Sequence, residues 1–127
     1  MNTSQFSVHG LDHVQIAMPA GQEAKAREFY SEVLGLIEVP VPASLANRGV
    51  IWFERESLRV HLGIDADFHP AKKAHPAFLV KQLDLLAGHL QRAGIAIVAA
   101  TPIQGRKRFH IFDPFGNRIE LLELLSS

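Results

Sequence analysis

An internal repeat constrains this chain more than any other feature of its sequence. The first half contains "LDHVQIAMP", "EAKAREFYSEVLGLIEV" and "VIWFERESLRVHLGI"; the second contains "KAHPAFLVK", "LDLLAGHLQRAGIAIV" and "FHIFDPFGNRIELLE". In each half a strand pattern precedes a helical pattern that ends at a glycine, and further strands follow. The two glycines lie 59 residues apart, at Gly35 and Gly94. The sequence therefore predicts two copies of one βαβββ module.

The same spacing of 59 residues aligns the ends of the two halves. "VIWFERESLRVH" falls on "FHIFDPFGNRIE", which places Val50 on Phe109 and His61 on Glu120. The segments "ERES" and "DPFGN" are rich in residues that suit tight turns, so each half should end in a hairpin. At the front of each half, "LDH" aligns with "KAH" at a slightly larger spacing, which the connection between strand and helix can absorb.

Strand alternation then places one polar residue from the first and the last strand of each half on a common face. In "LDHVQIAM", "RVHLGI", "HPAFLV" and "NRIELL", a histidine or glutamate lies opposite a row of apolar side chains. These residues are His13, His61, His75 and Glu120. Because the apolar row would pack on a helix, we expect the four polar residues on the concave side of the sheet.

The predicted fold class is α+β, with two tandem βαβββ modules that form a concave, partly open mixed sheet and helices on its outer face. A module of 55 to 60 residues buries too little apolar surface to be stable alone. We therefore expect one domain over residues 8–125, with the first module at about 10–65 and the second at about 74–124. The polar segment "DADFHPAKKAHP" reads as the linker between them.

Composition narrows the classes of partner. Thirteen basic residues balance thirteen acidic ones. The protein therefore has no strong net positive field that would attract nucleic acid or an anionic membrane. The chain has no cysteine, which excludes disulfides and thiolate ligands. It shows neither a signal peptide nor an apolar run of the ~20 residues that cross a bilayer. The sequence predicts a cytoplasmic protein with no nucleic-acid or membrane partner.

The four equivalent polar positions suggest a metal site. Imidazole and carboxylate ligands suit zinc, nickel, manganese or iron, and an incomplete ligand set leaves positions for a substrate. Taken singly, a strand histidine is more often a hydrogen-bonded residue, and Glu120 would more often be solvated. We assign such ordinary roles to His9, His69 and His89, a solvated position to Glu123, and core positions to Trp52 and Phe53.

The paired modules, together with "LDHVQIA", "AREFYSEVLGL", "AHPAFLV" and "DPFGNRIEL", resemble the vicinal oxygen chelate superfamily. This superfamily includes glyoxalase I, fosfomycin-resistance transferases, extradiol dioxygenases and bleomycin-resistance proteins. The resemblance implies that His13, His75 and Glu120 are metal ligands. It adds a fourth ligand position at His61, where bacterial glyoxalase I has a glutamate. It also implies a homodimer, in which His13 and His61 of one chain face His75 and Glu120 of the other.

The resemblance favours a divalent-metal-dependent glyoxalase-like enzyme, a lyase or related transferase. Such an enzyme acts on a small vicinal-oxygen substrate or its thiol conjugate. Two alternatives stay open: a drug- or metabolite-binding resistance protein without turnover, and a small extradiol-type dioxygenase. Glu120 is the candidate catalytic base. Gln15, Arg106 and Arg108 are the candidate substrate-binding residues, and the two arginines predict an anionic small molecule.

Overall fold

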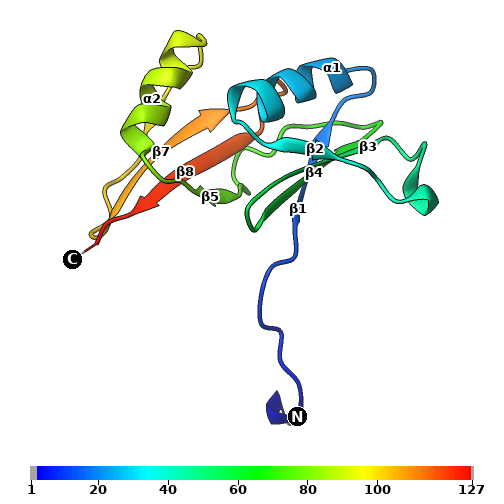
Figure 1. Ribbon diagram of the computed structural model, residues 1–127, viewed down its shortest axis with the longest axis horizontal. Helices are drawn as coiled ribbons and strands as arrows, with labels where there is room; N and C mark the ends of the chain where they lie inside the picture. The colour runs from blue at the N-terminus through cyan, green and yellow to red at the C-terminus, as the bar shows by residue number, and fades with distance from the viewer. Residues whose placement is uncertain (1–2, 127) are drawn as a thin grey trace.

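The computed structural model describes residues 3–126 and contains two four-stranded mixed sheets (Figure 1). The first sheet has the order β1-β4-β3-β2. Its strands are β1 (Val14–Met18), β2 (Ile37–Val39), β3 (Val50–Arg55) and β4 (Leu58–Ile64). The first strand runs parallel to β4, and the other neighbours are antiparallel.

The second sheet repeats this arrangement, with the order β5-β8-β7-β6. Its strands are β5 (Ala77–Leu79), β6 (Val98–Ala99), β7 (Arg106–Phe112) and β8 (Arg118–Leu124). The pair β5 and β8 is parallel, whereas β7 is antiparallel to both of its neighbours. The α+β, two-module fold predicted from the repeat is therefore confirmed, and the sheets do not close into a barrel.

Helices cover one side of both sheets (Figure 1). In the first module α1 (Glu23–Ala26) continues directly into a π-helix, η2 (Arg27–Val33), and in the second α2 is a regular helix (Leu83–Arg92). Two short 3₁₀ turns, η1 (Thr3–Gln5) and η3 (Ala43–Leu45), complete the elements. The core lies between helices and sheets, and its fully buried side chains include Met18, Tyr30, Phe53, Leu62, Leu90, Ile111, Ile119 and Leu121.

The register of the hairpins corrects the alignment of the two halves. Trp52 pairs with His61 in the first hairpin, and His110 pairs with Glu120 in the second. The structural counterpart of His110 is therefore Trp52, whereas a uniform spacing of 59 places it on Ile51, a core residue. The reason is the turn, because the DPFGN connection is one residue longer than its counterpart. A one-residue shift turns every side chain of a strand to the opposite face.

The turn "DPFGN" also fastens the two modules together. The Tyr30 hydroxyl donates to Oδ2 of Asp113 at 2.7 Å, and both groups are buried. The Asn117 amide donates to the carbonyl of Ala17 in β1 at 2.9 Å, while its oxygen accepts from the backbone N–H of Ala71 at 2.9 Å. One turn of the second module thereby satisfies polar groups on a strand and a helix of the first.

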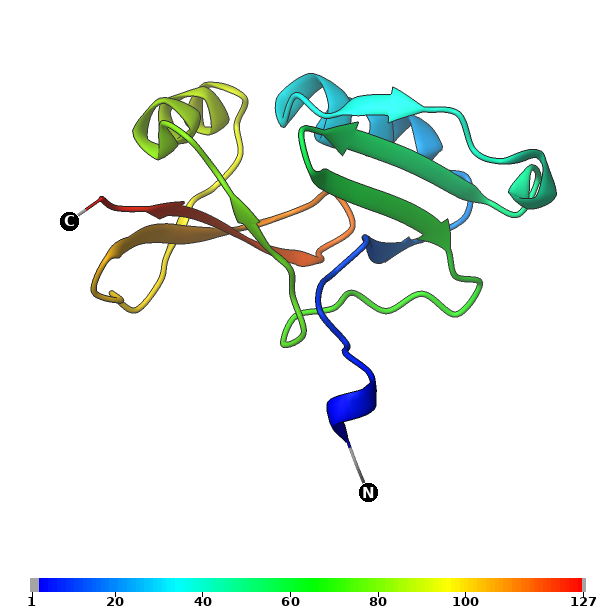
Figure 2. The same cartoon turned by 60° about the horizontal axis from the view of Figure 1, so that its bottom comes forward.

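The side of the sheets opposite the helices, here called the open face, has no layer of its own over it (Figures 1 and 2). The chain exposes 8655 Å², whereas a compact monomer of 14.1 kDa exposes roughly 6,700 Å². The segment before β1 extends away from the body with exposed Phe6, Val8 and Leu11 (Figure 1). Within residues 3–126, no helix has the length and apolarity needed to span a membrane.

Candidate metal centre

Three potential metal ligands meet on the open face of the second sheet. Glu120 comes from β8, His110 from the neighbouring position of β7, and His75 from the segment just before β5. Nε2 of His75 lies 3.1 Å from Oε1 of Glu120, and Nε2 of His110 lies 3.7 Å from the same oxygen. One ligand atom from each residue lies within 4.8 Å of the other two. We call these residues the second-module cluster.

Arg108 fixes the carboxylate of this cluster. Its Nη1 donates to Oε2 of Glu120 at 3.2 Å, while Nε and Nη2 donate to the carbonyl of Thr101 at 3.1 and 2.7 Å. Burial alone would raise the pKa of the Glu120 carboxyl, but hydrogen bonds from His75 and Arg108 outweigh burial and lower this pKa below its usual value. Glu120 therefore stays ionised, with Oε1 directed toward the two imidazoles.

The hydrogen bonds of His75 show which ring nitrogen is free to bind a metal. Its Nδ1 lies 2.9 Å from the carbonyl of Lys73, which can only accept, so Nδ1 carries a proton. Nε2 donates to Oε1 of Glu120 when it carries a second proton, and offers a lone pair to a metal ion when it does not. That contact is favourable only if a second proton or a cation lies between the two atoms. A metal-binding histidine usually has this outer hydrogen bond.

The separations within the cluster fit a divalent cation. Two ligand atoms about 2.1 Å from the same ion are roughly 3.0–3.5 Å apart at angles near those of a tetrahedron or octahedron. The distance of 3.1 Å between His75 and Glu120 lies in this range, and the 3.7 Å of His110 exceeds it by a few tenths of an ångström. The residues present can therefore hold such an ion.

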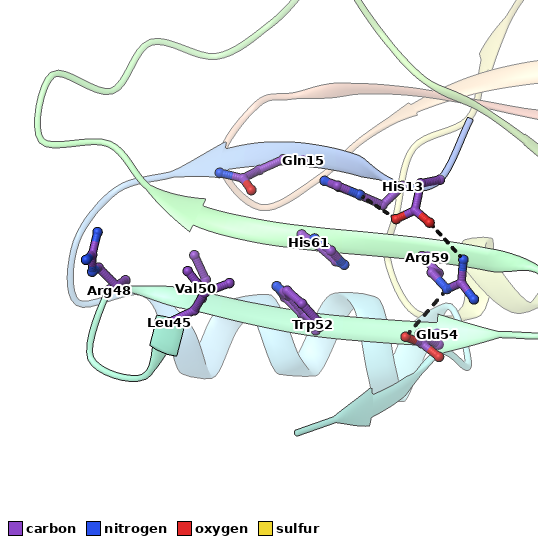
Figure 3. Close-up of a pocket in the computed structure, with 10 residues that line it drawn as sticks. His13, Gln15, Leu45, Arg48, Val50, Trp52, Glu54, Arg59 and His61 are labelled. Atoms are coloured by element: carbon purple, nitrogen blue, oxygen red, sulfur yellow. Dashed lines mark hydrogen bonds and ion pairs between the residues drawn. The ribbon is translucent and has the colours of Figure 1, made fainter. Parts of the chain in front are cut away.

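A second group of imidazoles lies on the open face of the first sheet (Figure 3). The ring of His61 is stacked between those of His13 and Trp52, with 4.1 Å between centroids on each side. Nδ1 of His13 lies 2.9 Å from Oδ2 of Asp12 and donates its proton there, which leaves Nε2 free. We call His13, His61 and Trp52 the first-module cluster.

Burial determines the charge of His61. The residue is only 4% exposed, and its Nε2 has no hydrogen-bond partner among the described residues. Desolvation, with a smaller contribution from His13, lowers the pKa of His61. The hydrogen bond from His13 lowers the pKa of Asp12, so this carboxylate remains charged beside the cluster. A neutral imidazole with a free nitrogen can act as a ligand.

The first-module cluster borders a cavity of about 520 Å³, a volume typical of small-molecule sites. Gln15 reaches into it across Gly63, where an added Cβ would lie 2.6 Å from the Gln15 amide nitrogen. Arg59 is paired with Asp12 at 3.2 Å. Arg48 also borders the cavity and has no ion-pair partner among the described residues (Figure 3). It is thus the cation most available to an anionic ligand.

The structure brings the predicted ligands together in two pairs. His75 meets Glu120, and His13 meets His61, but the two pairs belong to separate clusters within one chain. His13 and His75 do line one groove of about 580 Å³ between the first strands of the two modules. Arg108 holds Glu120 in place, whereas Arg106 is exposed at the start of β7. Both arginines lie in β7.

Three residues have roles that the sequence analysis did not assign. His110 was given no role, because a uniform spacing of 59 residues aligns it with the buried Ile51 and not with Trp52. Trp52, expected in the core, lies instead on the open face and stacks on His61. Glu123, expected to be solvated, is half-buried and accepts from the backbone N–H of Leu83 at 3.0 Å, at the start of α2.

Comparison with known proteins agrees with this fold. Residues 10–121 match the family model of the glyoxalase/bleomycin resistance protein/dioxygenase superfamily. The chain belongs to this superfamily. A crystal structure of a glyoxalase-family protein from Bacillus anthracis is 42% identical, with a TM-score of 0.90 over 94% of this chain and 98% of that one. Among curated proteins, no sequence matches significantly.

More distant structures share the superfamily fold. A glyoxalase-family protein from Enterococcus faecalis is 23% identical, with a TM-score of 0.71 over 91% of this chain and 98% of that one. The fosfomycin resistance protein FosX from Listeria monocytogenes is 15% identical, with a TM-score of 0.69 over 95% of each chain. Members of the superfamily typically bind divalent metal ions and small-molecule substrates.

Proposed function

We propose that this protein is a divalent-metal-dependent enzyme of the glyoxalase type. Its substrate is a small molecule with two adjacent oxygens, or the thiol conjugate of such a molecule. The proposal depends chiefly on one observation: Nε2 of His75 faces Oε1 of Glu120 at 3.1 Å, with Nδ1 of the same ring engaged by a backbone carbonyl. Of the metals that suit this ligand set, zinc, nickel, manganese and iron are the candidates.

In this proposal His13, His75 and Glu120 hold the ion, and His61 is available as a fourth ligand. When bound, the ion supplies Lewis acidity toward the two substrate oxygens. Glu120 would accept a proton from an acidic C–H at Oε1, while Arg108 keeps Oε2 in place. Gln15 donates a hydrogen bond to a bound oxygen.

The site is completed by a second copy of the chain. Within one chain the two clusters are separate, and the chain as a whole, including the extended segment before β1, exposes about 1,900 Å² more than a compact monomer of its mass would. A standard interface buries about 800 Å² on each partner, so the open face has enough surface for one. We assign His13 and His61 of one protomer and His75 and Glu120 of its partner to each metal centre.

Mixing two inactive variants tests this arrangement. One variant carries His13→Ala and His61→Ala, and the other carries Glu120→Gln. If sites are shared across the dimer, a mixed dimer keeps one intact site, and random exchange restores about a quarter of the wild-type metal content and activity. If each site is built within one chain, mixing restores nothing beyond what the two variants retain separately, and the dimeric part of the proposal is wrong.

Turnover tests the enzyme class. The metal-loaded protein should convert the adduct of methylglyoxal and a thiol, and Glu120→Gln should abolish this conversion. Binding of the adduct without conversion, by a chain that retains no zinc, nickel or manganese, would favour a sequestering protein. Oxygen uptake with a catechol and ferrous iron would instead favour a dioxygenase, because a two-histidine, one-carboxylate set also suits iron.

A further inference from the structure

His110 is the residue of the second-module cluster that the proposed ligand set does not use. It pairs directly with Glu120 across β7 and β8, and its side chain is 15% exposed. Nε2 of His110 is buried and has no hydrogen-bond partner among the described residues. A buried nitrogen without a partner costs folding free energy, so its presence on the open face needs an explanation.

We propose that His110 is itself a ligand of the divalent ion. The second module then presents three ligands from one chain: Nε2 of His75, Nε2 of His110 and Oε1 of Glu120. This inference rests on the proposed function in placing the ion at Glu120. It adds one ligand to the set proposed above, and this ligand comes from β7 of the same module as His75 and Glu120. The class of ion is the divalent transition-metal class named above, and Co²⁺ serves as its spectroscopic probe.

The distance from Nε2 of His110 to Oε1 of Glu120 is close to that expected between two ligands of one ion, and not that of a hydrogen bond. At 3.7 Å, Nε2 of His110 is too far from Oε1 of Glu120 for a hydrogen bond. It is close to the separation of two ligands on one ion. The other carboxylate oxygen, Oε2, is engaged by Arg108. Oε1 is therefore the atom that both imidazoles share, as expected if all three bind the same ion.

A cysteine at position 110 gives a direct readout. The protein contains no cysteine, so a thiolate bound to Co²⁺ could come only from the introduced residue. The full-length His110→Cys protein loaded with Co²⁺ should show the near-ultraviolet charge-transfer band of a thiolate–cobalt bond. Phe112→Cys is the matched control, because it lies two residues along the same strand on the same face. It should show no such band.

A second variant keeps the inference testable if His110→Cys fails to fold. His110→Phe retains a ring of similar size and should weaken Co²⁺ and Zn²⁺ binding by more than about 100-fold, beyond the effect of losing an outer-shell partner. The visible spectrum of any bound Co²⁺ should also change. The affinity of His13→Ala for the same ions, measured in parallel, shows how far metal binding depends on the first module.

Three results would overturn the inference. In the first, the folded His110→Cys protein shows no thiolate band, and His110→Phe keeps the wild-type affinity and cobalt spectrum. His110 is then not a ligand, but the proposed function stands if Glu120→Gln abolishes metal binding. Weaker binding by His110→Phe with an unchanged cobalt spectrum and no thiolate band gives His110 a structural role only. A wild-type protein that binds neither ion overturns both this inference and the proposed function.

Discussion

Nε2 of His75 lies 3.1 Å from Oε1 of Glu120, and the two residues are 45 positions apart in the sequence. The parallel pairing of β5 with β8 brings them together, because Ala77 pairs with Glu120 and His75 lies two residues before it. The opposite nitrogen of His75 is engaged by a carbonyl, and the second oxygen of Glu120 by Arg108. Both residues thus present their remaining ligand atoms to the same space.

Asp12 should control the metal affinity of His13. The hydrogen bond between Asp12 and Nδ1 of His13 orients the ring and increases the basicity of Nε2. Asp12→Asn should therefore weaken zinc binding by roughly 10–100-fold, measured by calorimetric titration. Asp84→Asn is the control, because within residues 3–126 Asp84 forms an ion pair only with Lys107, on the surface of α2. Equal affinities in wild type and Asp12→Asn would place His13 outside the coordination sphere.

Asn117 should be a major stabilising residue of the fold. It is 2% exposed, and its side chain bonds to Ala17 in the first module and to Ala71 in the linker. Asn117→Ala leaves buried polar groups without partners and should lower the free energy of unfolding by roughly 2–4 kcal/mol. Urea denaturation measures this loss. Gln91→Ala, at an exposed position of α2, should change it by less than about 0.5 kcal/mol.

Much of this arrangement follows from the sequence, because the strand period of two assigns faces without knowledge of contacts. The repeat predicted the two modules, and alternation placed His61 and Glu120 on the faces of their strands opposite the apolar side chains. His110 was not assigned a role, although its alternation with the buried Phe109 and Ile111 is compatible with the open face, because one extra residue in the turn upsets the alignment of β7 with β3 at a uniform spacing of 59. The role of Glu123 depends on where α2 begins above β8, which is a tertiary contact that leaves no local pattern.

Glu123 should contribute to the stability of α2. Gln82, at the N-cap position, makes no side-chain cap, and the Glu123 carboxylate accepts from the first backbone N–H groups instead. Glu123→Ala should cost about 1 kcal/mol, as the loss of a helix cap does. Glu56→Ala is the matched control, because it removes only an exposed ion pair with Lys81 and should cost close to nothing. Equal thermal stability of the two variants would contradict the capping role.

Tyr30 should make the fold sensitive to alkaline pH. Burial, with the adjacent Asp113 carboxylate, raises the pKa of Tyr30 well above its usual value near 10. The folded state therefore keeps a proton that the unfolded state releases. The contribution of Tyr30 to stability is complete below pH ~10 and is lost as pH rises through the folded-state pKa.

Two measurements check this pH dependence. Tyr30 is the only tyrosine, so phenolate absorbance reports its ionisation alone and should appear together with unfolding. Tyr30→Phe should have a lower free energy of unfolding at neutral pH, because Asp113 loses a donor, but a smaller further loss between pH 9 and 11. Phenolate formation near pH 10 in the folded protein would show that the hydroxyl is not held as described.

Zinc stoichiometry in wild type, His75→Ala and Glu120→Gln tests the central claim most directly. Equilibrium dialysis of the three full-length proteins, each shown to be folded by circular dichroism, should give about one tightly bound ion per wild-type chain and none in either variant. Full occupancy in both variants would contradict the assignment of the metal centre to His75 and Glu120, even with the superfamily fold intact.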